Sequence, residues 1–232
     1  FGLGVAFSFS LFGILKNYDI NWENSFLLAS FILFICAFPL LIFSGKEIEE
    51  RQVKPYQGII IVLKSVFRTF RNKKASPFIL GYGGHTYELF GFRSWTFPCI
   101  IFLSNHFSVS VNDAFIANSI GLMGFIGIFT SIYGAKYCLG KDRAQVVSNM
   151  GMLCFFVSIL TAISFWLSFW LALLMLFIYN ALITLDSGSL TTGTVINGES
   201  HDRGVRLALH SMVGFLGGAI GGPVVGFVLD NF

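Results

Sequence analysis

Three ionisable side chains, His85, Glu88 and Arg93, lie within nine positions of an otherwise apolar stretch. A charge at membrane depth costs about 3 kcal/mol or more and usually faces a bundle interior or a water-filled path. Helical spacing places Tyr82, His85 and Arg93 on about one face, with Glu88 one step round. We expect this face to line a central cavity. There Arg93 would attract an anionic or strongly polar substrate, and His85 and Glu88 would handle a coupled proton.

The same residues allow two other interpretations. In the first, they form a structural cluster in which Glu88 neutralises Arg93 or His85 against a neighbouring helix. In the second, His85-x-x-Glu88 is half of a metal site, but no second His/Glu pair occurs in another apolar segment. The sequence therefore predicts no metal site, and it indicates no cofactor.

Asp186 begins another polar patch, and a run of Ser and Thr residues follows it. We expect it near the cytoplasmic end of its helix. There it either pairs with Arg203 or Arg206 or is a simple interfacial residue, and the sequence does not decide between the two.

The composition is that of an integral membrane protein. Only 12% of the 232 residues are charged, against about 25% in a typical soluble domain, while 55% are hydrophobic and the mean hydropathy is +0.75. The net charge of +3 comes from few charges, which excludes nucleic acid as a partner. The four cysteines lie in or beside apolar runs, and we interpret them as small hydrophobic residues.

We predict seven membrane-spanning helices, the first of them cut short, because a helix needs about 20 mostly apolar residues to cross a bilayer. The segments are 1–15, 26–43, 78–103, 114–134, 146–163, 165–188 and 207–229. The stretch 146–188 is about twice as long as a membrane is thick. It therefore has to turn, and we place the turn at 164–168.

The basic residues predict the orientation. Thirteen of the fifteen Lys and Arg residues fall in segments 44–77, 135–145 and 189–206, whereas the intervening loops hold only Lys16. Because positive charge marks cytoplasmic loops, these three segments lie inside and the C-terminus lies outside. A receptor with seven helices has the opposite orientation, so we reject that class.

Segment 44–77 contains a predicted amphipathic helix. Its apolar residues recur at helical spacing, with Lys64, Arg68 and Arg71 on the other side. Such a helix should lie in the headgroup region near anionic lipid. We interpret the segment as a cytoplasmic linker between two bundles.

Glycines recur every four residues in the last apolar segment, at Gly214, Gly218, Gly222 and Gly226, with Gly217, Gly221 and Pro223 beside them. This spacing makes a flat stripe on one helix face, where a second backbone can approach closely. We expect tight helix packing there; a dynamic gate is the alternative.

The order of these segments resembles the middle and C-terminal half of a major facilitator superfamily transporter. The string GYGGHTYELFGFRSW (81–95) is similar to the seventh helix of one facilitator group. DSGSLTTGTVINGESHDRGVRLALHSMVGFLGGAIGGPVVGFVLD (186–230) is similar to that group's tenth and eleventh helices. The loop GAKYCLGKDR (134–143) stands where the family repeats its Gly-x-x-x-Asp-Arg loop, with Gly134 at its start and Asp142 and Arg143 at its end. Cys138 and Leu139 occupy the expected Asp-Arg positions, and Arg203 belongs to the next cytoplasmic loop.

This resemblance implies an all-α, MFS-type bundle covering roughly helices 5–11 of a twelve-helix fold. Residues 1–43 would end the N-terminal bundle, 44–77 would be the linker, and 78–232 would form five helices of the C-terminal bundle. It implies a secondary transporter in the plasma (inner) membrane that moves a small solute by alternating access and is not an enzyme. Its partners would be membrane lipid, the solute and the missing helices of the same protein. The alternatives are an intramembrane enzyme, for which no nucleophile or metal motif is present, and a non-transporting membrane scaffold.

Overall fold

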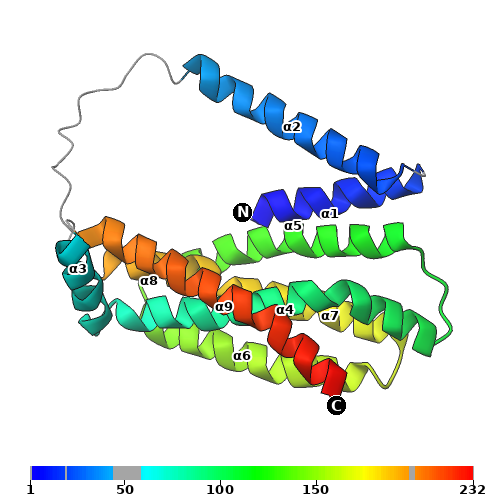
Figure 1. Ribbon diagram of the computed structural model, residues 1–232. Coiled ribbons are helices and arrows are strands. Elements are labelled where there is room, and N and C mark those ends of the chain that lie inside the picture. Colours follow the sequence, from blue (N-terminus) through cyan, green and yellow to red (C-terminus); the bar gives the residue numbers. More distant parts are fainter. Residues whose placement is uncertain (1, 19, 44–58, 199–201, 232) are drawn as a thin grey trace.

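The computed structural model of the protein describes residues 2–18, 20–43, 59–198 and 202–231, and the regular structure in these ranges is helical. The long helices from α4 onwards run side by side, and the connections α4–α5 and α6–α7 lie at the end of the bundle opposite the α5–α6 connection (Figure 1). The helices are α1 (Gly2–Asn17), α2 (Trp22–Phe43), α3 (Ile59–Arg71), α4 (Ser76–His106), α5 (Asp113–Tyr137), α6 (Arg143–Ser164), α7 (Phe169–Leu185), α8 (Ser187–Ile196) and α9 (Arg203–Asn231).

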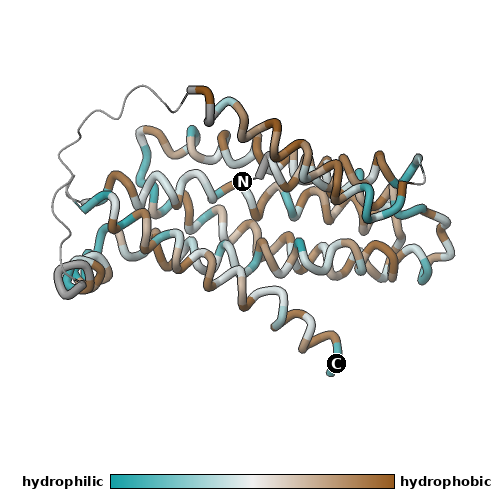
Figure 2. The backbone as a smooth tube through the Cα atoms, turned by 45° about the horizontal axis from the view of Figure 1, so that its top comes forward, coloured by the Kyte–Doolittle hydropathy of each residue, from teal (hydrophilic) through white to brown (hydrophobic). Residues whose placement is uncertain are grey.

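Within these described ranges, five helices are long and apolar enough to cross a membrane. They are Trp22–Pro39, Asp113–Tyr137, Arg143–Ser164, Phe169–Ile196 and Arg203–Asn231. Figure 2 shows apolar residues along most of the bundle, with hydrophilic residues gathered mainly near its ends. The chain is therefore an all-helical, multi-pass membrane protein. The other two predicted spans fall on α1, which has 16 residues, and on α4, which carries the three ionisable residues; seven spans remain a prediction.

The long apolar stretch turns where the sequence predicts. α6 ends at Ser164, and the Ser168 side chain accepts a hydrogen bond from the Leu171 amide at the start of α7. The following span is longer than predicted, because helix continues past residue 188 through α8 to Ile196. In α8, the hydroxyls of Thr191, Thr192 and Thr194 each donate a hydrogen bond to the backbone carbonyl four residues earlier. Because their hydroxyls are satisfied within the helix, this polar run can remain helical inside a bundle.

The glycine stripe of α9 lies against α4. A Cβ at Gly217 would meet the Gly83 carbonyl and the Thr86 hydroxyl, and one at Gly221 would meet the Tyr87 carbonyl. Two hydrogen bonds cross the same contact: Thr86 donates to the Gly214 carbonyl at 2.7 Å, and the Trp95 indole donates to the Gly222 carbonyl at 2.8 Å. Because the glycines of α9 have no side chain, the backbones of α4 and α9 can approach closely.

A second close contact joins α1 to α5. Cβ atoms at Gly121 and Gly124 would meet Ser10 and Ala6, and one at Gly13 would meet Asn118. α1 and α2 are in contact through Phe12 and Phe26, whose ring centroids lie 6.0 Å apart. Beyond this contact, α2 diverges from the other helices (Figure 1). Most of its described side chains are exposed, and its sequence is apolar all round, as in a helix that faces lipid or other helices.

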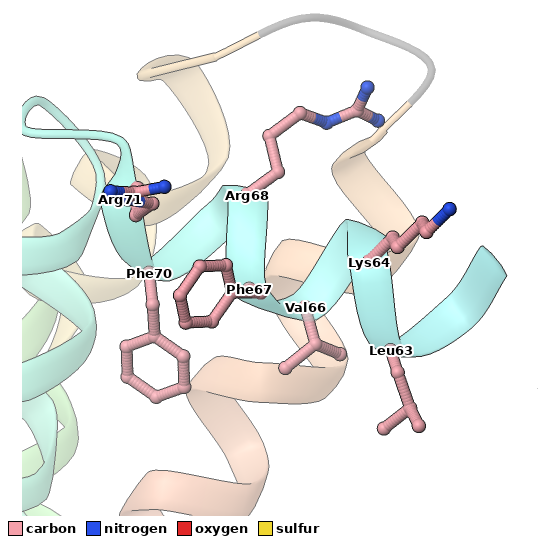
Figure 3. A pocket seen from close by; sticks show the side chains of 7 residues that line it. All are labelled: Leu63, Lys64, Val66, Phe67, Arg68, Phe70 and Arg71. Atoms are coloured by element: carbon pink, nitrogen blue, oxygen red, sulfur yellow. The ribbon is translucent and has the colours of Figure 1, made fainter. Parts of the chain in front are cut away.

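The predicted amphipathic segment forms α3, at the end of the bundle where α9 begins (Figure 1); residues 44–58 of the predicted linker lie outside the described residues. Figure 3 shows its apolar side chains on one side and its basic ones on the other. Arg68 pairs with Asp202 at 2.7 Å, and the Asn72 amide donates to the Asn197 carbonyl at 3.4 Å. These contacts join two of the predicted cytoplasmic segments. The groove along α3 is lined by Leu63, Lys64, Val66, Phe67, Arg68, Phe70 and Arg71.

Candidate functional site

A histidine–carboxylate pair joins α4 to the junction of α7 and α8. His85 Nδ1 lies 2.8 Å from Asp186 Oδ1, and the two side chains are 1% and 19% exposed. From the sequence, Asp186 is expected near the cytoplasmic end of its helix, either paired with Arg203 or Arg206 or as a simple interfacial residue. The structure instead places it at the junction, ten residues before Ile196, because α8 extends the span. A buried imidazole beside a carboxylate can accept and release a proton.

Two aromatic rings extend this pair towards α9. Tyr82 stacks on His85 with 5.6 Å between ring centroids and on His210 with 3.8 Å. The His210 nitrogens lie within hydrogen-bond distance of the Thr191 and Thr194 hydroxyls, at 3.2 and 3.0 Å. The sequence analysis did not connect His210 with this group. A histidine in an apolar segment was the one feature of the sequence that could have indicated a role for His210. Only tertiary packing shows that it stacks on Tyr82.

Tyr82 and His85 border a cavity of about 380 Å³ between α4, α5 and the α7–α8 junction. Arg93, near the middle of the 31-residue α4, lines it together with Tyr82 and His85, as the helical spacing predicts. The hydroxyls of Ser131, Thr184 and Ser187 add polar lining from the other helices. Arg93, His85 and several residues with hydroxyl groups therefore surround one space in an otherwise apolar bundle, and Asp186 reaches this space only through its contact with His85.

Glu88 does not line this cavity. Its Oε1 accepts hydrogen bonds from the Tyr179 hydroxyl at 2.6 Å and from the Cys154 thiol at 3.5 Å. It borders a different cavity, of about 630 Å³, between α4, α6, α7 and α9. The expectation that His85, Glu88 and Arg93 share one space is thus wrong for Glu88. At about 100° per residue, the five-residue step from Glu88 to Arg93 places their side chains about 140° apart around the helix.

Three further polar residues of the bundle, in two contacts, were not identified from the sequence. The Asn180 amide donates to the Met123 carbonyl at 2.7 Å, and the Thr184 and Thr130 hydroxyls lie 2.7 Å apart. Both contacts join α5 to α7. An asparagine within an apolar segment was the available signal, since such a side chain needs a buried partner.

The residues assigned to the cytoplasmic loops have separate positions. Gly134 lies against the Leu185 carbonyl and accepts a hydrogen bond from Ser189 at 3.0 Å. Asp142 caps α6 by accepting from the amides of Ala144 and Gln145, Arg143 is half-buried at the start of α6, and Arg203 is exposed at the start of α9. These positions form no common cluster with the cavity.

Arg206, in contrast, is 2% exposed. It donates to the carbonyls of Thr194 and Val195 at 3.2 and 3.1 Å. It thereby satisfies free carbonyls at the C-terminus of α8, where a cation is favourable. The start of α9 is thus tied to the end of α8.

Within the residues that the structure describes, no group of three or more His, Cys, Asp or Glu side chains could hold a metal ion. Comparison with known proteins assigns no family: no protein-family model, curated protein or solved structure gives a significant match to this chain.

Proposed function

We propose that the chain is part of a secondary active transporter of the major facilitator type, which moves a small solute by alternating access. The observation that carries this proposal is the cavity bordered by Arg93, His85 and, through His85, Asp186. Ionisable side chains inside a membrane protein are costly and are usually retained along a substrate or ion pathway. The quoted strings that resemble facilitator helices support the same class.

In this proposal Arg93 selects the solute. Its guanidinium offers several hydrogen-bond donors in a fixed plane. An anionic or strongly polar solute is therefore favoured in a cavity of about 380 Å³. The hydroxyls of Ser131, Thr184 and Ser187 can bind its polar groups.

The coupled proton is assigned to His85 and Asp186. Protonation of an imidazole whose Nδ1 atom lies 2.8 Å from a carboxylate oxygen would change the charge next to the solute cavity. Glu88, to which the sequence analysis also gave this role, is left out because it borders the other cavity. Solute and proton could then influence each other through the charge on the α7–α8 junction.

The proposal also assigns partners. α1 and α2 would belong to an N-terminal bundle and α4–α9 to the C-terminal one, so that the contact of α1 with α5 joins the two. Further helices of the same protein would close the cavity opposite α4. α3 would lie on the cytoplasmic surface of the plasma (inner) membrane, with Lys64 and Arg71 near anionic headgroups.

Uptake by the complete reading frame tests the proposal. Cells or vesicles that express it would be given a panel of labelled organic anions, sugars and amino acids, with and without a proton gradient. We expect gradient-dependent uptake of at least one polar solute. We expect Arg93→Ala to lower its initial rate by about tenfold or more, as loss of a charge-assisted contact does, and His85→Gln to remove the dependence on the gradient.

Asp230→Asn, at the exposed end of α9, is the matched control and should transport normally. Each variant would be compared at equal amounts of folded protein, measured by size-exclusion chromatography in detergent. Full uptake by folded Arg93→Ala and His85→Gln variants would contradict the assigned roles. A chain that gives no uptake of any solute would favour the scaffold alternative.

A further inference from the structure

α4 presents opposite charges to two separate cavities. Arg93 borders the smaller one with His85, and Glu88 borders the larger one, of about 630 Å³, on another side of the helix. The larger volume lies within the range of about 300–1,000 Å³ that is typical of sites for small organic ligands. The described residues around the two cavities do not overlap, so each can bind its own ligand.

The wall of the larger cavity is mostly apolar and aromatic. Five aromatic side chains contribute to it: Tyr87, Phe92, Trp95, Phe165 and Tyr179. Several of these rings are held in place. The Trp95 indole donates to the Gly222 carbonyl at 2.8 Å, and Phe92 meets Tyr179 edge to face at 5.4 Å. Fixed aromatic faces attract organic cations through the ring quadrupole.

Glu88 gives this wall its charge. Among the described lining residues it is the one with a formal charge, and its carboxylate is oriented by the Tyr179 hydroxyl at 2.6 Å and the Cys154 thiol at 3.5 Å. Both of these donors are neutral. A carboxylate oriented by neutral donors in an apolar wall favours a positively charged ligand. Its attraction for that ligand is stronger in an apolar environment than in water.

We propose that this cavity is a binding site for a lipophilic organic cation, such as a substituted amine, quaternary ammonium or phosphonium ion. The carboxylate would bind the charge, and the aromatic side chains would contact the apolar substituents. The volume is much larger than an inorganic cation requires, and an anion would meet Glu88. The proposal does not depend on transport through the Arg93 cavity.

Equilibrium dialysis of the purified full chain in detergent with labelled tetraphenylphosphonium tests the site. We expect saturable binding at about one ion per chain, and no saturable binding of triphenylphosphine oxide, which is similarly aromatic but neutral. Glu88→Gln should weaken the affinity by about tenfold or more, because it removes a charge-assisted contact. Glu88→Asp should weaken it less.

Two control variants separate this site from the rest of the molecule. Glu23→Gln removes a carboxylate from the exposed first turn of α2, and Asp230→Asn removes one from the exposed end of α9; both should bind the ion as the unchanged chain does. Equal affinity of the Glu88→Gln variant, or equal saturable binding of the neutral oxide, would overturn the proposal. Failure of the Arg93 variant to transport would bear on the proposed function alone.

A second measurement needs no variant. Cys99 lines the cavity, whereas Cys36 is exposed on α2. Tetraphenylphosphonium should slow the alkylation of Cys99 by a membrane-permeant maleimide, followed by mass spectrometry, and leave Cys36 unaffected. If Cys99 reacts at the same rate with and without a saturating amount of the ion, the ion does not occupy this cavity and the proposal fails.

Discussion

The His85–Asp186 pair joins two elements that are a hundred residues apart in sequence. His85 Nδ1 lies 2.8 Å from Asp186 Oδ1, and the His85 side chain is almost completely buried. Removing one partner of such a pair leaves the other buried without its counterpart, which is more costly than losing both. The pair therefore has a structural consequence that can be measured independently of transport.

We expect His85→Gln and Asp186→Asn each to lower the free energy of unfolding, and the double variant to lower it by less than the sum. The coupling between neighbouring buried groups should be about 0.5–3 kcal/mol. Unfolding of the purified chain in mixed detergent micelles, followed by circular dichroism, measures all three variants. Strict additivity would show that the two side chains do not interact.

At the scale of elements, the contact between α4 and α9 depends on the small size of glycine. The Gly217 position faces the Gly83 carbonyl and the Thr86 hydroxyl, whereas a Cβ at Gly204, near the start of the same helix, would meet nothing within 4 Å. The two glycines thus form a matched pair for one substitution in one helix.

Gly217→Ala should destabilise the chain by about 1–3 kcal/mol, because the added methyl group overlaps a backbone carbonyl and forces the helices apart. Gly204→Ala should be neutral or should stabilise by up to about 1 kcal/mol, because alanine favours helix. Thermal unfolding in one detergent compares them. A Gly217→Ala variant as stable as Gly204→Ala would indicate that α9 does not pack on α4 along this stripe.

At the scale of the whole molecule, the helices α4, α5, α6 and α7 alternate in direction, so the described connections between them fall at two ends (Figure 1). The Arg68–Asp202 ion pair brings two of the three basic segments together at one end. Exposed Lys141 lies in the third basic segment, and exposed Ser110 lies in the connection between α4 and α5. These two positions report the orientation of the whole chain.

With the native cysteines replaced, Ser110→Cys in intact cells should react with a membrane-impermeant maleimide, and Lys141→Cys should react only after permeabilisation. We expect this difference because loops rich in Lys and Arg stay on the cytoplasmic side of the membrane, and Lys141 lies in such a loop whereas Ser110 does not. Gel-shift detection of the labelled chain is sufficient. Labelling of Lys141→Cys in intact cells would reverse the predicted orientation, and labelling of both positions would disprove the alternation.

Membrane residence, helical class and the approximate helix positions followed from sequence alone. Long apolar segments cannot be covered by 27 charged side chains in water, and in a bilayer they must satisfy their backbone groups internally, which helices do. The glycine spacing likewise predicts a flat helix face. These properties depend on composition and on the helical period, which are local.

The partners of the polar residues were decided only by tertiary structure. Tyr82, His85 and Arg93 follow the helical period and do line one cavity, but Glu88, three residues from His85, borders another and binds Tyr179 of a different helix. Asp186 faces His85 because α8 extends the span to Ile196, beyond the predicted end at residue 188, and places the carboxylate inside the bundle. Periodicity determines how residues are arranged on one helix, whereas the packing of several helices determines which neighbour each face meets.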